Sequence, residues 1–403
     1  MNRATISILL VFLLMGVADA MGPLSDAVEK RYLVSSFAAT LLPFFVFIAF
    51  ALFSVPGGLL AGRIGKKRLL LLGLSFNAAA LLVPSAIEPD FVTLLACIFV
   101  LGVGTTFLQV AGNPIMRDVS QEGQFSRNLA VAQGVKGLGS ASSAYLVTTI
   151  ASLGLFQSMG WRGAFPMLFA LMVIALILVA FLRVNETQTD KPPSLRTSLA
   201  LLKEPIFALA VLGIFLYVGA EVCMGRFTKP ALSQLGYSDK AAAFYGPAAF
   251  FLLLTVGRLL GGVVLNVVSP IGCFRGSAFI GLLGTAIVMI GSERMTPVGI
   301  VFAGIGFANI WPMLFSITVD HRPNRANELS GLLCMAISGG AIIPLVMGWL
   351  IDLSWGALAF VVPAASFAYL LALSIWQATA ARGLPSAELH LRTIPTELGE
   401  TET

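Results

Sequence analysis

The feature that most constrains this chain is a succession of twelve predominantly apolar runs separated by short polar stretches. Each run has a length that lets an α-helix cross the roughly 30 Å hydrocarbon core of a bilayer. Lipid offers the backbone no hydrogen-bond partners, so a spanning segment of this kind is helical. The runs cover residues 5–24, 35–61, 69–87, 91–115, 127–152 and 162–182, then 206–228, 242–268, 276–292, 297–318, 329–351 and 355–378. The sequence therefore predicts an all-α membrane protein with twelve transmembrane helices, the first of them retained rather than cleaved as a signal peptide.

The composition argues against a soluble enzyme. Charged residues make up only 11% of the 403 positions, and hydrophobic residues make up 57%. A soluble domain carries about 25% charged residues, so this chain is short of groups for a water-facing surface and must use the lipid bilayer as its solvent. The net charge of +5 is spread over short loops, which argues against a nucleic-acid partner. We see no nucleophile–base set and no metal-ligand spacing, and we expect neither an enzyme nor a bound cofactor.

The longest polar stretch divides the spans six and six. Between Arg183 and Lys203 the chain is rich in charges, prolines and hydroxyls, which indicates a solvated linker. We expect an N-terminal six-helix bundle at 1–183, a linker at 184–204, a C-terminal six-helix bundle at 205–380 and a tail at 381–403. Most loop Lys and Arg residues fall on the side that holds both termini. The positive-inside rule then predicts a multi-pass protein of the cell inner membrane with both termini cytoplasmic.

A glycine-rich basic loop follows the second span. Residues 58–67 read GLLAGRIGKK, in which Gly65 allows a tight turn and Arg63 and Lys66 hold the loop on the inner side as gating or structural residues. This segment resembles the loop signature of the major facilitator family, although an Asp of that signature is Gly62 here. A related pattern, GRLLGG, begins at Gly257 in the eighth span, where we expect Arg258 to be a structural tether near the inner end. The alternative for the loop is a plain topology signal. The resemblance implies the major facilitator fold of two six-helix bundles.

Four segments resemble one branch of that family more narrowly. They read QVAGNP at 109–114, FLYVGAE at 215–221, ANIWPMLFS at 308–316 and SGLLCMAISGGAIIP at 330–344. Together they are similar to the fucose–galactose–glucose/proton symporter family, the branch of the fucose permease. The resemblance implies that a sugar, a neutral hexose first of all, is carried down a proton or sodium gradient. We expect the protein to be a monomer.

The sequence departs from that branch at its coupling positions. The branch has a carboxylate at the position of Gln109 and an Asn at the position of Lys136. It also has a carboxylate near Pro23, whereas the nearest one here is Asp19, one helical turn earlier. Gln109 cannot titrate, so the resemblance implies that the coupling machinery has been rebuilt or is absent.

Charged residues inside the spans are candidates for ion coupling. A charge at the centre of a bilayer costs at least about 2.5–3.5 kcal/mol, so it needs water, a partner or a substrate. Asp19 and Lys136 lie in spans that border the central cavity of the fold that the resemblance implies. We expect them to pair, so that a proton or sodium ion at Asp19 releases Lys136; the alternative is a structural bridge. Glu221 is a second candidate, with Arg226 or Arg258 as its partner.

Polar and aromatic residues in the spans are candidates for substrate binding. Gln109 and Asn113 are spaced i, i+4, and Gln133 shares a helix face with Lys136. Amides suit sugar hydroxyls, which both donate and accept hydrogen bonds; the alternative is hydrogen bonding between helices. In the second half the candidates are Tyr217, Asn309 and Trp311. We expect Pro312 to break its helix and expose backbone carbonyls. The Trp311 ring is a candidate platform on which a sugar stacks; the alternative is ordinary packing against other side chains.

These observations favour a cation-coupled sugar symporter that works by alternating access of two bundles. A second hypothesis keeps the fold and changes the cargo, to an exporter or importer of an acidic sugar, a drug or another metabolite, with Lys136 as counter-ion. A third is a membrane sensor that transports nothing.

Overall fold

The computed structural model describes residues 3–18, 28, 31–34, 38, 41–152, 159, 162–187 and 193–382. Within these ranges the chain is helical and contains no strand. The helices of the first half are α1 (Arg3–Ala18), α4 (Leu41–Ile64), α5 (Lys66–Ala86), α6 (Phe91–Asp118), α7 (Phe125–Ser152) and α8 (Ala164–Phe181). The link to the second half contains the short helix α9 (Leu195–Ala200) and the turn η2 (Leu201–Lys203).

The second half also makes six passes, several of them built from more than one helical piece. The passes are α10 (Pro205–Gln234); α11 (Asp239–Ala243), η3 (Phe244–Ala248) and α12 (Ala249–Val264); α13 (Pro270–Met289); α14 (Met295–Phe307) and α15 (Ile310–His321); η4 (Pro323–Arg325), α16 (Ala326–Met335), η5 (Ala336–Ser338) and α17 (Gly339–Asp352); and η6 (Gly356–Phe360) with α18 (Val361–Arg382).

These passes follow the order of the predicted spans. Among the described residues, ten helices are long and apolar enough to cross a membrane, and α1 and α7 complete the predicted twelve. The boundaries differ by a few residues; α10, for example, runs on to Gln234 instead of ending near residue 228. The first span was predicted to reach residue 24, but residues 19–24 lie outside the described ranges.

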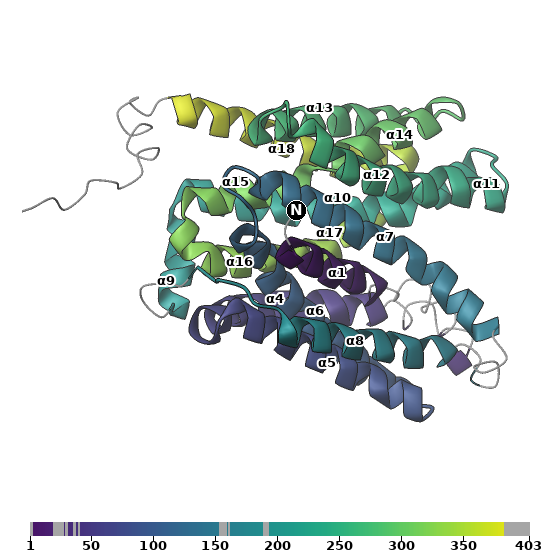
Figure 1. Ribbon diagram of the computed structural model, residues 1–403. Helices are drawn as coiled ribbons and strands as arrows, with labels where there is room; N and C mark the ends of the chain where they lie inside the picture. The colour runs from purple at the N-terminus through teal and green to yellow at the C-terminus, as the bar shows by residue number, and fades with distance from the viewer. Residues whose placement is uncertain are drawn as a thin grey trace, which may run out of the picture.

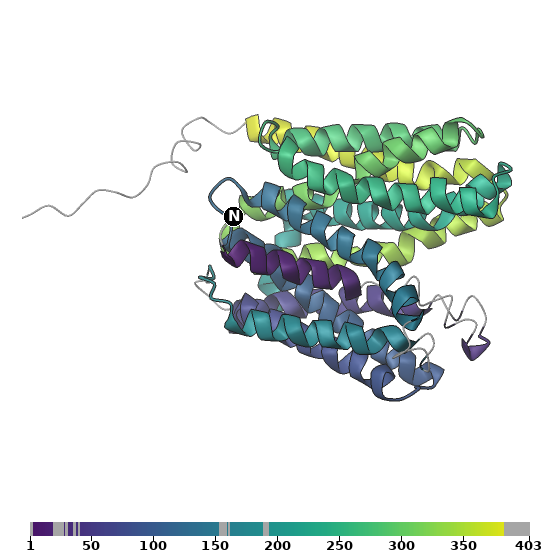
Figure 2. The same ribbon diagram turned by 45° about the vertical axis from the view of Figure 1, so that its right-hand side comes forward.

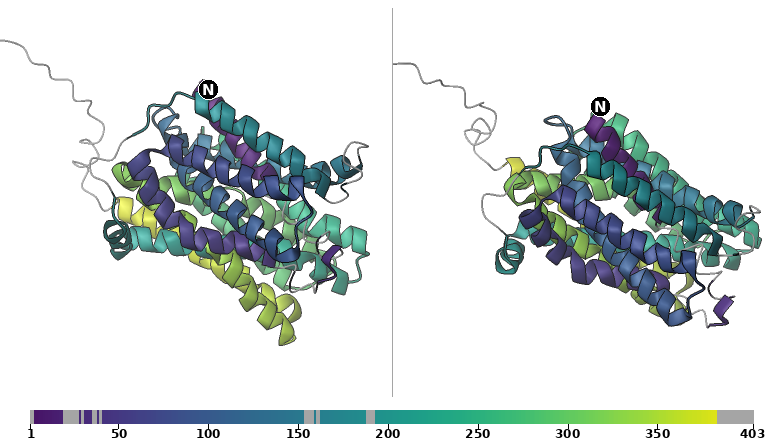
Figure 3. Two further views of the ribbon diagram at one scale, coloured as in Figure 1. Left: turned by 90° about the horizontal axis from the view of Figure 1, so that it is seen from below. Right: turned by 60° about the horizontal axis from the view of Figure 1, so that its bottom comes forward.

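The passes form two groups that lie side by side (Figure 1). In the first group α5 packs against α6 and α8, and α1 packs against α7. In the second, α13 packs against α14 and α18, and α10 packs against α17. The helices of both groups run lengthwise beside one another when the molecule is turned (Figure 2), and the views from below show the same arrangement (Figure 3). Large apolar side chains such as Phe181 and Phe279 remain exposed, as expected of a surface that faces lipid.

The two groups meet along two seams, α4 against α16 and α7 against α12. Glycines allow the close approach at the first seam. A Cβ atom placed on Gly58 would lie 2.5 Å from the Asn327 carbonyl oxygen and 3.2 Å from Gly331 Cα. Small residues at such contacts let helix backbones approach closely and gain van der Waals packing in a membrane. A larger side chain at Gly58 would therefore push the two halves apart.

We call the end of the molecule that contains α9 and the α4–α5 turn the linker end, and the opposite end the far end. The first helical residues of α1 also lie near the linker end, because the Thr5 hydroxyl donates to the Val119 carbonyl just after α6. The described end of α18 lies at the same end in Figure 1.

Candidate functional site

A cavity of about 300 Å³ lies between the two bundles, midway along the helices. Its walls come from α4, α6 and α7 of the first bundle and from α10, α12, α15 and η5 of the second. The polar and aromatic members of its lining are Phe47, Phe50, Thr105, Gln109, Gln133, Lys136, Tyr217, Glu221, Arg258 and Trp311. A concave, mostly apolar space with a few convergent polar groups is typical of a small-molecule site. Most of the polar residues singled out from the sequence therefore meet in one place.

The wall from the first bundle is built from amides on α6 and α7. Gln133 Nε2 donates to Asn113 Oδ1 at 3.1 Å, and Asn113 Nδ2 lies 3.5 Å from Gln109 Oε1. Gln109 and Gln133 line the cavity, whereas Asn113 is fully buried behind them. Asn113 thus makes the hydrogen bond between helices that was the alternative to substrate binding, and it positions the two glutamine side chains.

Lys136 on α7 also lines the cavity. Its backbone lies against α1, because a Cβ atom placed on Gly16 would be 1.9 Å from the Lys136 carbonyl oxygen. The predicted partner of Lys136, Asp19, lies outside the described residues. The Asp19–Lys136 ion pair therefore stays a prediction.

The wall from the second bundle is an ionic and hydrogen-bonded cluster. Arg258 on α12 lies 3.3 Å from Glu221 on α10, Nη2 to Oε2. The same Nη2 lies 3.0 Å from the Tyr217 hydroxyl, and Tyr217 is itself fully buried on α10. Arg258 was predicted to be a tether near the inner end of its span. That placement was wrong: the residue lies in the cavity wall, where it pairs with Glu221.

The cluster is completed by a break in the tenth pass, between α14 and α15. Proline has no backbone N–H, so Pro312 cannot donate to the carbonyl of Ala308 one turn earlier. Arg258 Nε donates to that carbonyl oxygen at 3.1 Å, and the Tyr217 hydroxyl donates to the Phe307 carbonyl at 3.1 Å. Side chains from two other helices thus satisfy the carbonyls that the break exposes.

Asn309 lies in the break and Trp311 follows it at the start of α15, and the two side chains have different surroundings. Asn309 Nδ2 donates to the Gly257 carbonyl at 3.0 Å, and its side chain packs on Gly261. The prediction that Asn309 contacts substrate is not supported by this position, because the side chain faces α12 instead of the cavity. Trp311 lines the cavity and is only 5% exposed. Its indole N–H has no hydrogen-bond partner within the described structure.

At the linker end, α5 begins at Lys66, directly after its N-cap residue Gly65. Gly65 has φ +93°, a conformation that favours glycine. The Glu186 carboxylate accepts hydrogen bonds from the backbone N–H groups of Lys66 and Lys67, at 2.5 and 3.1 Å, so it caps the positive end of α5. Lys66 Nζ pairs with Asp118 at the end of α6, and both side chains are buried. Arg63 is exposed beside them and lines a polar hollow with Glu186.

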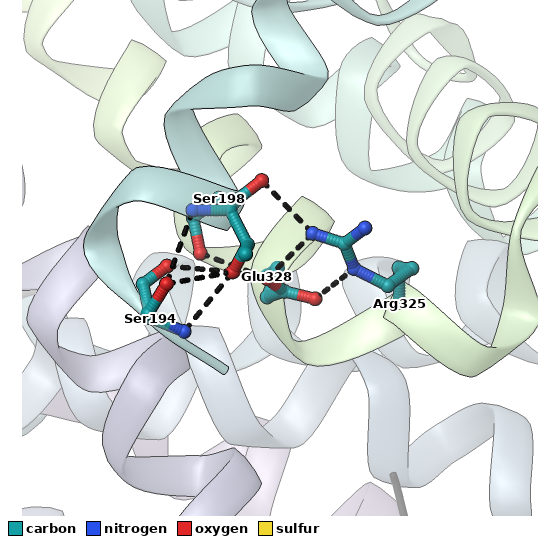
Figure 4. Close-up of polar contacts among 5 residues, drawn as sticks. Ser194, Ser198, Arg325 and Glu328 are labelled. Carbon is teal, nitrogen blue, oxygen red and sulfur yellow. Dashed lines mark hydrogen bonds and ion pairs between the residues drawn. The ribbon is translucent and has the colours of Figure 1, made fainter. Parts of the chain in front are cut away.

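A second cluster attaches α9 to the start of α16 (Figure 4). The Glu328 carboxylate accepts hydrogen bonds from the Thr197 hydroxyl at 3.2 Å and the Ser198 hydroxyl at 3.1 Å, and it pairs with Arg325. Arg325 Nη2 also donates to the Thr197 carbonyl at 2.9 Å. We name these four residues the α9 clasp. Glu328 was not predicted from the sequence, although a carboxylate at the start of an apolar span was the available signal.

Further contacts join the bundles at the linker end. Arg117 pairs with Asp320 at 3.1 Å, and the hydroxyls of Ser126 and Ser316 lie 2.8 Å apart. At the far end, a second cavity of about 500 Å³ lies between α4, α10 and α17. It shares the lining residues Pro43, Phe47 and Val222 with the central cavity. The central cavity thus adjoins open space toward the far end and is separated from the linker end by contacts between the bundles.

Known proteins resemble this chain in sequence or in fold. A glucose/galactose transporter of Brucella abortus biovar 1 is 28% identical over 347 residues, which cover 82% of this chain and 83% of that protein. A putative glucose/galactose transporter of Helicobacter pylori (strain ATCC 700392 / 26695) is 25% identical over 362 residues, which cover 86% and 88%. The crystal structure of FucP, a major facilitator transporter in the outward conformation, superposes with a TM-score of 0.83 at 18% identity, covering 93% of this chain and 98% of that one.

The family model described as Major Facilitator Superfamily matches residues 1–343. This match and the superposition confirm the predicted all-α fold of twelve transmembrane helices in two bundles. The resemblance seen in the loop after the second span and in the four segments is confirmed as well. The chain belongs to the Major Facilitator Superfamily.

Proposed function

We propose that the protein is a secondary transporter that carries a sugar across the membrane together with a cation by alternating access. The observation that carries the proposal is the cavity between the bundles, whose polar walls come from both of them. Transporters of this architecture hold substrate near the bilayer midplane and rock one bundle against the other around it. The relatives named as glucose/galactose transporters support a sugar as cargo.

The chemistry of the cavity suits a neutral hexose. Gln109 and Gln133 present amides, which donate and accept hydrogen bonds as hydroxyl groups do. Trp311 offers an aromatic face and an unpartnered N–H. Apolar side chains from α4, among them Phe47 and Phe50, complete the lining opposite α10.

In the proposed cycle, the central cavity of this conformation is open toward the far end. Opening the linker end requires that the Arg117–Asp320 pair and the Ser126–Ser316 contact separate. We place the linker end in the cytoplasm, because the basic residues of the loops gather there. Both termini are then cytoplasmic, and the protein acts as a monomer in the inner membrane.

The coupling ion is a proton, with sodium as the alternative. Asp19 with Lys136 and Glu221 with Arg258 are the two candidate pairs. We expect Asp19→Asn to abolish gradient-driven uptake while leaving counterflow exchange, which needs no net ion movement. Full uphill accumulation by this variant would remove Asp19 from the mechanism.

The proposal is tested with purified protein in liposomes. Radiolabelled glucose, galactose and fucose are supplied under an inward proton gradient and, in parallel, an inward sodium gradient. We expect accumulation of at least one sugar above the equilibrium level under one gradient. An absence of flux for all three sugars would reject these neutral sugars as cargo and would favour a sugar acid or a sensor function.

An acidic sugar is a second candidate cargo. Two cationic side chains, Lys136 and Arg258, line the cavity, against one carboxylate, Glu221, among the described lining residues. If the cargo is a sugar acid, Lys136→Ala should remove the preference for acids over neutral sugars in a competition assay. An unchanged preference in that variant would exclude Lys136 as the counter-ion.

A further inference from the structure

Glu221 is the one carboxylate among the described residues that line the central cavity. Its side chain is 22% exposed, so water and protons in the cavity can reach it. The first-bundle wall offers Gln109, which cannot titrate. The charged or titratable groups that share the cavity with Glu221 are Arg258 from α12, Tyr217 from its own helix and Lys136 from α7.

Arg258 has two hydrogen-bond partners besides Glu221. Its Nε binds the Ala308 carbonyl and its Nη2 binds the Tyr217 hydroxyl, at 3.1 and 3.0 Å, while the Glu221 contact is longer at 3.3 Å. The neighbouring residue Gly257 is held in turn by Asn309. Neutralising Glu221 therefore releases one contact of the Arg258 guanidinium. Its hydrogen bonds to the Ala308 carbonyl and the Tyr217 hydroxyl hold it beside the break in the tenth pass.

The pair also lies beside a seam between the bundles. On α12, Leu259 and Thr255 face glycines of α7: a Cβ atom placed on Gly134 would be 2.6 Å from Leu259 Cδ2, and one on Gly137 would be 2.7 Å from Thr255 Oγ1. Arg258 is adjacent to Leu259 on the same helix. A rearrangement of the Glu221–Arg258 contact thus acts on a helix that must move relative to the first bundle during alternation.

We propose that Glu221 is the proton-binding site that couples ion movement to sugar movement, with Arg258 as its counter-ion; this rests on the proposed transport function. A proton entering from the far end converts the carboxylate to the carboxylic acid, and no other bond forms or breaks. Arg258 Nη2 then has a donor free for a sugar hydroxyl. Sugar binding favours the protonated form, and protonation favours sugar binding by the same factor, as linkage requires. After the linker end opens, loss of sugar allows Glu221 to release its proton and pair with Arg258 again.

The test compares the wild type with Glu221→Gln in liposomes, using the sugar that the wild type transports. Three quantities are measured: accumulation under an inward proton gradient, counterflow exchange without a gradient, and alkalinisation of the medium when sugar is added. We expect E221Q to lose accumulation and alkalinisation while keeping counterflow, because its amide cannot carry a proton. The matched control is Glu88→Gln, which changes an exposed loop carboxylate that pairs with Arg31 outside the cavity. This control should behave as the wild type does.

Proton-coupled accumulation by E221Q at the wild-type level overturns the proposal and leaves the transport function standing. Wild-type accumulation that follows sodium and moves no protons also overturns it. A wild type without sugar flux rejects the proposed function itself, so the two failures are distinguishable.

If E221Q does not fold, as judged by its thermal unfolding, Glu221→Asp is the second variant. The shorter carboxylate can still bind a proton, but it lies farther from Arg258. We expect sugar-dependent alkalinisation to persist and the pH profile of uptake to differ from that of the wild type. A pH profile identical to that of the wild type contradicts the proposal.

Discussion

Lys66 and Asp118 form an ion pair in which each side chain is only 2% exposed. Two charges removed from water are tolerated only with good mutual geometry and further hydrogen bonds. Asp118 has a second donor in the Thr187 hydroxyl, 2.8 Å from its Oδ1. This single pair therefore ties the start of α5, the end of α6 and the beginning of the linker together.

Replacing Lys66 with Met leaves the Asp118 carboxylate buried without its counter-ion. Removing one partner of such a pair costs about 3–5 kcal/mol of folding free energy. We expect a large fall in the unfolding temperature of K66M in detergent. The matched control is Lys67→Met, because the neighbouring Nζ is more exposed and binds only the Ala180 carbonyl; a control as unstable as K66M would contradict this explanation.

The environment of Trp311 predicts a measurable effect on the affinity for the transported sugar. Its indole N–H is buried in the cavity wall without a partner in the described structure, so we expect it to donate to a sugar oxygen. Trp311→Phe keeps a ring and removes the donor. A hydrogen bond is worth about 0.5–1.5 kcal/mol, so affinity for the transported sugar should fall by roughly two- to tenfold, as measured by calorimetry. Trp355→Phe, which changes an exposed tryptophan outside the cavity, is the control; equal affinities for W311F and the wild type would assign Trp311 to packing.

At the scale of elements, the short helix α9 contacts α4 of the first bundle and α16 of the second, although it is too short to span the membrane. Its hydroxyls bind Glu328 at the start of α16, while the earlier part of the linker, Glu186 and Thr187, binds the α4–α5 turn and the end of α6 (Figure 4 shows the α16 side). The linker is thus anchored to each bundle by a separate carboxylate. An opening at the linker end must strain or release one of these anchors.

Ser198→Ala removes one donor to the buried Glu328 carboxylate and should favour opening of the linker end. Cys334, fully buried between α6 and α16, reports this opening when Cys97, Cys223 and Cys273 are replaced by Ser. A hydrogen bond to a charged group contributes about 1.5–3 kcal/mol, so the rate of maleimide labelling should rise by at least about tenfold. Ser75→Ala, whose hydroxyl binds only within α5, is the control. No increase in S198A would show that the clasp does not restrain opening.

At the scale of the whole molecule, the two bundles must separate at one end while they approach at the other. The described conformation closes the linker end through contacts that lie on both seams and between α7 and α15. Sugar flux therefore depends on breaking contacts remote from the cavity. This dependence can be tested without changing any residue that lines the site.

A disulfide across the linker end should stop transport reversibly. The hydroxyls of Ser126 and Ser316 lie 2.8 Å apart, so Ser126→Cys with Ser316→Cys, in a background with the four native cysteines replaced, places two thiols within bonding reach. We expect oxidation to abolish uptake into liposomes, and reduction to restore it, while sugar binding from the far end persists. Ser126→Cys alone should be insensitive to oxidant. Undiminished uptake by the oxidised, cross-linked protein would exclude opening at this end.

The positions of individual residues in the structure show which features could be predicted from the sequence alone. The helix break at Pro312 was predictable, because a missing N–H acts within one turn of its own helix. The grouping of Gln109 with Asn113 followed from their spacing, yet only the fold shows that Asn113 binds Gln133. Asn309 was assigned to the cavity from its place beside Pro312 in the tenth span, whereas its side chain turns toward α12.

The sequence by itself determined the class of the protein, the number and order of its spans and the division into two halves. These properties depend on the bilayer, which requires a hydrophobic length in every span and places the basic loops on one side. The tertiary structure alone decided that Arg258 pairs with Glu221 in the cavity, that Glu328 holds α9 and that one end is closed. The physical reason is that spacing along a helix tells which residues share a face, whereas the neighbour that meets that face is set by the packing of all the other helices.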